Sequence, residues 1–298
     1  MSMQSKIQMQ KSKKKSDKII AKSTQKLIAN TITYFLLIVG SFLIMIPFYW
    51  LVSSALKDSS HVFDIPPQWI PNPIKWSNYP EALKYMNFFG CLKNTCIITF
   101  TAMAGQLMSA SLVAYGFARM RFPGRDFLFV VLLSTIMLPP QVTLIPVFKI
   151  FTSLGWYDTF YPLTVPAFFG GGVFAIFLLR QYYMTIPIEM DEAAKIDGAG
   201  TFGVFTKVIL PQAKPALATV AIFSFMAHWN DFLGPLIYLG DPTKRTLALA
   251  LWAFQGEHAT DWNLLMAAAT VVMLPLLVLF FAAQKHFIQG VVISGVKG

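Results

Sequence analysis

Long apolar runs separated by short charged segments dominate the pattern of hydrophobic and polar positions along the chain. The runs have the length, about 20 residues, that a helix needs to cross the hydrocarbon core of a bilayer. They are continuous rather than alternating, which disfavours transmembrane β-strands. Because helices satisfy all their backbone groups internally, the pattern predicts an all-α membrane protein with six transmembrane helices. The predicted spans are 30–54, 94–118, 127–148, 159–183, 215–240 and 264–284.

Composition supports this interpretation and excludes several classes of protein. Hydrophobic residues make up 55% of the chain and charged residues 13%, about half the share found in soluble domains, so a soluble enzyme, a disordered chain and a nucleic-acid-binding domain are all disfavoured. The mean hydropathy is +0.56. The two cysteines cannot form a disulfide framework, and the four histidines (61, 228, 258 and 286) lack the spacing of metal ligands. We expect neither a metal site nor a catalytic residue in this chain.

The distribution of the +10 net charge predicts the orientation in the membrane. Lysines and arginines concentrate in the N-terminal segment and in the loops that six spans place on the same side. Positive charge is retained in the cytoplasm, so both termini are expected there. The predicted parts are a cytoplasmic basic tail (1–26), a six-helix domain (27–290) and a cytoplasmic C-terminal tail (291–298). The basic tail has two interpretations, an orientation signal lying against anionic lipid and a partner-binding segment.

A long cytoplasmic segment, 186–214, has the pattern of two short helices joined by a turn. Pro187 suits the start of the first helix. Gly198 and Gly200 suit its end, because glycine readily adopts a left-handed conformation. Three acidic residues occupy the first part of this helix, where the helix dipole favours negative charge. They are Glu189, Asp191 and Glu192.

The second helix of this elbow is predicted to begin after a cap at Thr201 and to end at Pro211. The first helix has an apolar face that no lipid covers, formed by Ala193, Ala194 and Ile196. Such a face either contacts another protein or folds back on its own helical bundle.

The elbow resembles a known family. Glu192-Ala193-Ala194, followed by Gly198 and then Val208-x-Leu210-Pro211, is similar to the signature cytoplasmic loop of bacterial ABC importer permeases, with valine in place of the usual isoleucine at 208. Three other segments resemble the maltose/oligosaccharide-type subunit with six spans. They are Pro66–Tyr79, Trp229-Asn230-Asp231-Phe232 and the C-terminal stretch from Gln284 to Gly298.

The resemblance implies a permease subunit in the cell membrane of a bacterium that forms, with a second homologous permease, the path for a sugar or oligosaccharide. Two ATP-binding subunits would supply ATP hydrolysis with Mg, and an extracellular solute-binding protein would deliver the solute. The chain has no phosphate-binding Gly-x-x-x-x-Gly-Lys-Ser/Thr loop, so no cofactor is expected in it. The residues that would couple it to the ATPase are Glu192, Ala193, Ala194, Asp197, Gly198, Leu210 and Pro211. Those that would contact the binding protein, in the last outer loop, are Gln255, Gly256, Glu257 and His258.

Polar side chains at membrane depth are candidates for the translocation path. They are Thr99, Gln106, Gln141, Asn230 and Asp231. The alternative is that such groups hold helices together by hydrogen bonds. Alternatives also remain for the whole chain: the same superfamily with a non-sugar polar solute, or a different class, such as a stand-alone secondary transporter or channel, or a membrane-embedded enzyme. The sequence leaves the sugar and its length open.

Overall fold

The computed structural model describes the backbone of residues 3–255 and 260–295 and the side-chain environments of 26–255 and 260–284. In these residues every regular element is a helix, and the one extended pairing is an isolated bridge between Gln255 and Thr260. The predicted all-α class is therefore confirmed. Four helices are long and apolar enough to cross a membrane, and the count is six if each of two sharply bent helix pairs is one span.

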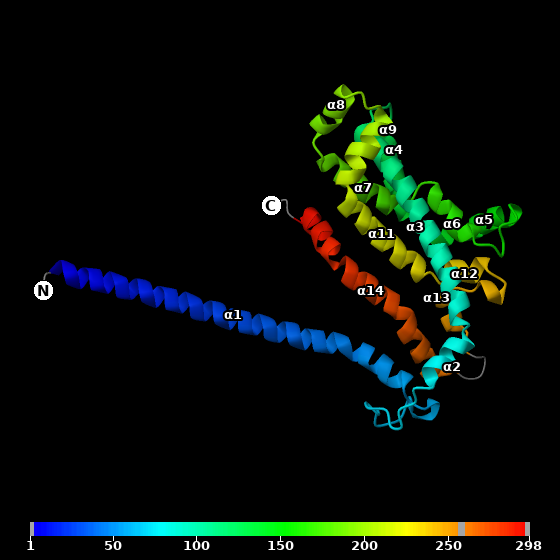
Figure 1. The fold of residues 1–298 in the computed structure, drawn as a ribbon, viewed down its shortest axis with the longest axis horizontal. Helices are drawn as coiled ribbons and strands as arrows, with labels where there is room; N and C mark the ends of the chain where they lie inside the picture. The colour runs from blue at the N-terminus through cyan, green and yellow to red at the C-terminus, as the bar shows by residue number, and fades with distance from the viewer. Residues whose placement is uncertain (1–2, 256–259, 296–298) are drawn as a thin grey trace.

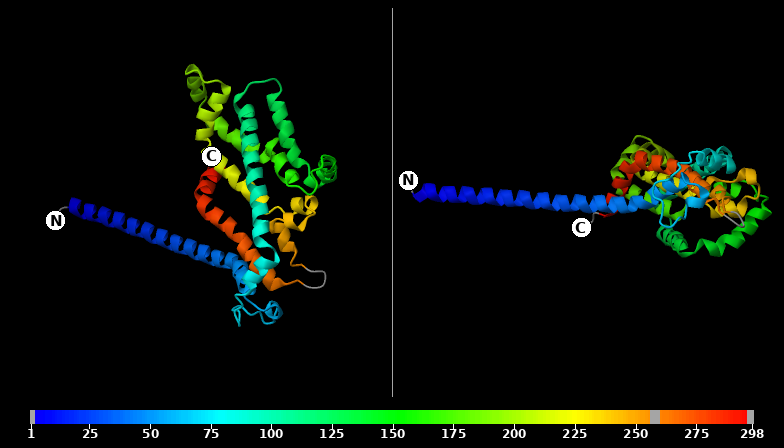
Figure 2. Two further views of the ribbon diagram at one scale, coloured as in Figure 1. Left: turned by 45° about the vertical axis from the view of Figure 1, so that its right-hand side comes forward. Right: turned by 90° about the horizontal axis from the view of Figure 1, so that it is seen from below.

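The first helix, α1 (Met3–Ala55), extends away from the rest of the molecule, and only its C-terminal end meets the bundle, against α14 (Trp262–Gly295) (Figure 1). Both views in Figure 2 show the same separation. Between Leu27 and Val52 most of its large apolar side chains are exposed. A helix that is hydrophobic all round suits a lipid environment or another helix. The predicted span 30–54 lies within this helix, and α14 contains the predicted span 264–284.

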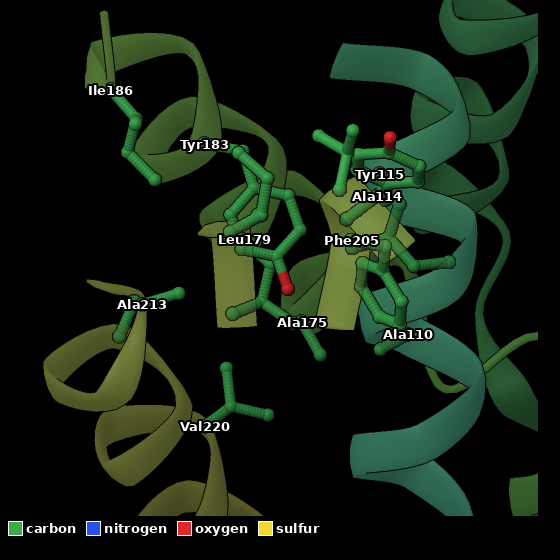
Figure 3. Close-up of a cluster of buried hydrophobic side chains, with 14 of the residues drawn as sticks. Ala110, Ala114, Tyr115, Ala175, Leu179, Tyr183, Ile186, Phe205, Ala213 and Val220 are labelled. Atoms are coloured by element: carbon green, nitrogen blue, oxygen red, sulfur yellow. The ribbon is translucent and has the colours of Figure 1, made fainter. Parts of the chain in front are cut away.

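The centre of the bundle is α3 (Phe88–Arg119), which packs against α7 (Val173–Thr185) and α11 (Lys214–Trp229). Small residues on α3 and α7 let the two helices approach closely. Figure 3 shows Ala110 and Ala114 facing Ala175 and Leu179 in one buried cluster. Phe205 belongs to the same cluster, so the elbow shares a core with the membrane helices.

Three predicted spans are interrupted. The run 127–148 forms α4 (Arg125–Ser134), a 3-10 turn (Thr135–Met137) and α5 (Pro140–Ser153), and the chain bends by 99° at the break. Pro139 and Pro140 have no backbone N–H, so the helical ladder cannot continue through them. The run 215–240 forms α11 and the short α12 (Leu233–Tyr238), separated by Asn230 to Phe232. Each of these two runs therefore contains a break between helices, and the break in the first lies at the tandem prolines.

The third interruption divides the run 159–183. Here α6 (Tyr161–Thr164) and a 3-10 turn (Val165–Phe168) are followed by a glycine triplet and then by α7. Gly170, Gly171 and Gly172 all have positive φ. At Gly171 a Cβ atom would lie 2.5 Å from the backbone nitrogen of Ala110, so only glycine fits this close approach to α3.

The remaining helices complete the two ends of the bundle. At the end farthest from the elbow, α2 packs against α14, and α13 packs against α3 and α14 (Figure 1). Their contacts include a second buried cluster around Ala82, Leu247 and Phe254. The short elements not yet given are η1 (Ser59–His61), α2 (Asn78–Tyr85), α8 (Ile188–Ile196), α9 (Thr201–Val204), a π-helix (Phe205–Ile209), α10 (Leu210–Gln212), η5 (Pro242–Lys244) and α13 (Leu247–Trp252).

Candidate functional site

The first arm of the elbow is α8, which begins directly after Pro187 and ends at Ile196. Its C-terminus is closed by two backbone hydrogen bonds, from the Gly198 N–H to the Lys195 carbonyl (3.0 Å) and from the Ala199 N–H to the Ala194 carbonyl (2.9 Å). This is the Schellman arrangement, which places a left-handed residue one position after the cap. Gly198 has φ +85°, as the sequence pattern predicts for a turn-forming glycine.

The second arm differs from the expectation. Thr201 is the first residue of α9, and Gly200, not Thr201, occupies the capping position. Pro211 lies inside α10 and does not end the arm, which continues to Gln212 before the chain turns by 78° into α11. Proline is tolerated in the first turn of a helix because its missing N–H has no intrahelical partner there. A π-helical turn precedes it, in which the Leu210 N–H donates to the Phe205 carbonyl.

The side chains of α8 divide between two environments. Glu192, Ala193 and Ile196 are exposed, Ile196 to 86%. Ala194 instead packs against the buried cluster shared with α3 and α7. The predicted apolar face is thus divided: Ala194 folds back on the bundle, whereas Ala193 and Ile196 remain exposed in the described part of the chain.

The other predicted coupling residues continue this division. Asp197 and Gly198 are exposed beside Ile196 at the turn. In the second arm Leu210 packs against the buried cluster while Pro211 is exposed. The exposed residues therefore gather on α8 and the following turn, at the end of the molecule that Figure 1 shows at the top.

The sequence did not single out the residues that attach the elbow to the bundle. Asp191 is buried and forms an ion pair with Arg119 at the end of α3, with 3.5 Å between Nε and Oδ2. Arg119 Nη2 also donates to the Ile186 carbonyl (2.6 Å). The hydroxyl of Tyr115 donates to the Thr201 carbonyl (3.0 Å). The sequence shows Arg119 as a basic residue at the end of a span and Asp191 as an acid in the first turn of a helix, and neither position indicates that the two side chains meet.

Two candidate path residues lie on α3. Thr99 is fully buried, and its hydroxyl has no hydrogen-bond partner among the described residues. Gln106 Oε1 accepts a hydrogen bond from Ser224 Oγ of α11 (2.7 Å). Gln106 therefore joins two helices, which is the alternative role that such an amide has in membrane bundles.

The other three candidate path residues lie at helix breaks. Gln141 is exposed in the first turn of α5, just after the 99° bend. Asn230 follows the end of α11 and donates from Nδ2 to the Met226 carbonyl (2.8 Å). Asp231 Oδ1 accepts from the Gly234 N–H (3.1 Å) in the first turn of α12. No described hydrogen bond or ion pair joins Gln141 to the other four residues.

The loop that the sequence predicts to be the last outer one is described only at its two ends. Gln255 is exposed and pairs with Thr260 in the isolated bridge, and Phe254 beside it is buried against Tyr85, with ring centroids 5.0 Å apart. Gly256, Glu257 and His258 lie outside the described residues. The described ends thus form the stem of a narrow hairpin.

A polar clamp connects two other loops on this side of the bundle. The Asp158 carboxylate accepts hydrogen bonds from Lys244 Nζ (2.7 Å) and from the N–H groups of Gly240 and Asp241 (both 3.0 Å). The lysine first, and then the backbone donors, hold the pKa of Asp158 below its ordinary value. The clamp fixes the connection between α5 and α6 to the segment that follows α12.

An all-helical bundle with broken helices around the continuous α3 and an anchored elbow at one end is the architecture of a polytopic membrane protein. Residues 106–293 match the family described as "Binding-protein-dependent transport system inner membrane component". The chain therefore belongs to this family: it is an inner-membrane, multi-pass ABC importer permease, a subunit that is not itself catalytic.

Relatives match along most of the chain. The probable ABC transporter permease protein YurM of Bacillus subtilis (strain 168) is 35% identical, with 85% of this chain and 83% of the relative covered. The sn-glycerol-3-phosphate transport system permease protein UgpE of Yersinia pestis bv. Antiqua (strain Antiqua) is 32% identical, with 88% and 95% covered. The osmoprotective compounds uptake permease protein GgtD of Synechocystis sp. (strain ATCC 27184 / PCC 6803 / Kazusa) is 35% identical, with 74% of each covered.

The fold is also similar to a solved structure. One chain of a bacterial ABC transporter involved in the import of the acidic polysaccharide alginate matches with a TM-score of 0.76 at 23% identity, covering 87% of this chain and 96% of that chain. A structure of bacterial alginate ABC transporter in complex with an alginate pentasaccharide-bound periplasmic protein matches with a TM-score of 0.61 at 16% identity, covering 87% and 94%. At these identities the likeness concerns the fold.

Proposed function

We propose that this permease forms, with a second homologous permease, the translocation path of a sugar or oligosaccharide importer. Two ATP-binding subunits bind at the cytoplasmic end and hydrolyse ATP with Mg, and an extracellular binding protein delivers the solute. The termini and the elbow face the cytoplasm in this arrangement, because positive charge concentrates on that side of the chain. The lipid bilayer surrounds the spans, and no nucleic acid is involved.

The observation that carries the proposal is the exposed surface of α8. Glu192, Ala193 and Ile196 stand free at the end of the molecule while the other side of the same helix is fixed to the bundle. An exposed apolar patch with a carboxylate at its edge suits a protein groove that supplies a basic residue. ATP-driven closure of the two ATPase subunits would then act on this surface and switch the bundle between two states.

The candidate path follows α3 and the helix breaks. The helices break beside Gln141 and Asn230. In membrane proteins, backbone that leaves the helix at membrane depth is tolerated where it lines a water-filled cavity. We therefore assign Gln141, Asn230 and Asp231 to the path. Thr99 and Gln106 border it from α3.

The sugar class is supported by the resemblance of the outer loop, the fifth span and the C-terminal stretch to the maltose/oligosaccharide-type subunit. Relatives named for sn-glycerol 3-phosphate and for osmoprotective compounds keep a second candidate open, a small polar solute that is not a sugar. The two candidates differ in the chemical class of the solute, which identification of the bound solute separates.

The test is to purify the assembled complex with its binding protein and to identify the solute that the binding protein retains. The complex is then reconstituted in vesicles, and uptake of the same solute is measured with and without MgATP. A retained sugar and ATP-dependent uptake support the proposal. A retained phosphate ester transfers the function to the second candidate, and uptake without any ATPase subunit would overturn the importer mechanism itself.

A further inference from the structure

A buried ion pair joins the elbow to the central helix of the bundle. Arg119 is the last residue of α3 and Asp191 lies in the first part of α8, and their side chains are only 7% and 3% exposed. The same guanidinium donates to the carbonyl of Ile186, the first residue of the elbow. One arginine therefore holds both the entry into the elbow and the first turn of its first helix.

Stability alone does not account for this pair. Two charges removed from water are costly, and apolar residues of similar volume often give an equally stable core. The pair is also incompletely bonded, because Asp191 Oδ1 has no hydrogen-bond partner among the described residues. Ala194, Ala199 and Val204 already attach the elbow to the bundle through apolar contacts. Arg119 Nε likewise has no hydrogen-bond partner among the described residues. What the pair adds is direction, because one planar guanidinium lies against the Asp191 carboxylate and donates from Nη2 to the Ile186 carbonyl.

The position of the pair connects the exposed surface of α8 with α3. Asp191 and Glu192 are consecutive residues on a helix, so their side chains diverge by about 100°. Asp191 is buried against Arg119, whereas Glu192 is exposed. One turn before Arg119, Tyr115 of the same helix donates to the Thr201 carbonyl in the second arm. Both arms of the elbow are thus bonded to the C-terminal turns of α3.

We propose that Arg119 and Asp191 are positioning residues of the coupling step, which transmit displacement of the elbow to α3. This inference rests on the proposed function, in which the elbow receives the motion of the ATPase subunits. When the exposed face of α8 moves, the guanidinium moves with it, and α3 carries the displacement toward Gln106 and Thr99. Without the pair, apolar contacts still hold the elbow in place but allow it to slide.

The experiment uses the complete complex with its partner permease, ATPase subunits and binding protein. The probe is MgATP with vanadate, which traps the closed ATPase dimer. The readout is hydrogen–deuterium exchange in two segments, the elbow (186–214) and α3 (Phe88–Arg119). We expect trapping to change exchange in both segments of the wild-type protein. In the double variant Arg119→Met/Asp191→Leu the elbow still responds, but the response of α3 falls by about fivefold or more.

A matched pair of single variants keeps the test decisive if the double variant does not assemble. Arg119→Lys retains the positive charge but cannot reach Asp191 and the Ile186 carbonyl with one planar fork, so the α3 response again falls. Arg121→Lys, two residues later and exposed, is the control and responds as the wild type does. If the pair only stabilised the fold, the double variant and Arg119→Lys would assemble less well, but the exchange response per assembled complex would be unchanged.

The outcomes separate this inference from the proposed function. A wild-type α3 response in the double variant, or in Arg119→Lys if only that variant assembles, overturns the positioning role and leaves the importer function standing. An elbow whose exchange is unaffected by trapping in the wild-type complex overturns the assignment of the elbow as the ATPase contact, and the inference falls with it.

Discussion

Asp191 and Glu192 are neighbours in the sequence with the same charge, yet the fold gives them opposite environments. Asp191 is buried against Arg119, while Glu192 faces outward. Sequence analysis selected Glu192 through its resemblance to a signature loop and treated Asp191 as one of several charges in the first turn. The difference follows from the position of α3, which no local pattern near residue 191 contains. The resemblance selected residues that the fold leaves exposed, such as Glu192, together with Ala194 and Leu210, which pack inward, and it did not select Asp191.

Glu192→Ala is expected to weaken docking of the ATPase subunits. A charge-assisted hydrogen bond contributes about 1.5–3 kcal/mol, and a basic partner left buried and unpaired adds to the loss. ATP-dependent uptake in reconstituted vesicles should therefore fall by about tenfold or more while the permease itself remains folded. Glu189→Ala, an exposed acid on the same helix, is the matched control and should transport normally. Equal losses in both variants would indicate a general effect of charge on α8.

The effect of substituting Gly198 is expected to arise from the backbone alone. A Cβ atom at this position would meet nothing within 4 Å, but φ is +85°. Asparagine tolerates this region better than alanine, and a β-branched residue tolerates it least. Uptake and melting temperature should therefore decrease in the order Gly, Asn, Ala, Val, with a cost of roughly 1–2 kcal/mol for alanine. Gly200→Ala, at φ −71° and with open space around it, involves no positive φ and should cost less than Gly198→Ala. A Gly198→Val variant as active and stable as the wild type would contradict this account.

At the scale of elements, hydropathy predicted apolar helical segments but not their shape. The run 127–148 is uncharged throughout, so its composition does not distinguish one straight helix from the two helices that meet at 99°. The tandem prolines in it indicated an interruption of the helical ladder, and the break lies there. The glycine triplet at 170–172 gives no local signal of its role. Its positive φ values accompany a close approach to Ala110 on α3, which lies far away in the sequence.

The clamp at Asp158 is an element-scale contact that can be tested by pH. Asp158 has φ +56°, which asparagine tolerates, so Asp158→Asn preserves the backbone while removing the charge that pairs with Lys244. We expect a lower melting temperature for the variant at pH 7.

The pH dependence has a definite sign. The pKa of Asp158 is lowered in the folded protein, so its stabilising contribution is complete above the ordinary value of 3.8 and is lost as the pH falls through the folded pKa. The difference in melting temperature between wild type and Asp158→Asn should therefore be constant from pH 6 to 8 and should shrink in acid. A difference that grows as the pH falls would contradict the direction of the pKa shift.

At the scale of the whole molecule, the two ends of the bundle are held by different kinds of contact. The elbow end is fixed by hydrogen bonds and a buried ion pair to α3, whereas the opposite end carries the loop from Phe254 to Thr260 on a two-residue stem. The sequence predicted a binding-protein contact in this loop by resemblance only. The buried ring of Phe254 makes this prediction testable. Phe254 packs against Tyr85 and so anchors one end of the loop, and this contact does not involve residues 256–259.

Replacing residues 256–259 by two glycines is expected to abolish solute uptake without disturbing the bundle. Gln255 and Thr260 can still pair across a short turn, and Phe254 remains buried against Tyr85, so assembly with the partner subunits should be normal. If the loop contacts the binding protein, the binding protein should no longer stimulate ATP hydrolysis, while basal hydrolysis continues. Phe254→Ala is the contrasting variant: it empties a buried site at a cost of about 3–5 kcal/mol and should lower assembly itself. Normal stimulation and uptake in the shortened protein would make this segment a connector, and delivery of the solute would then depend on other outer loops.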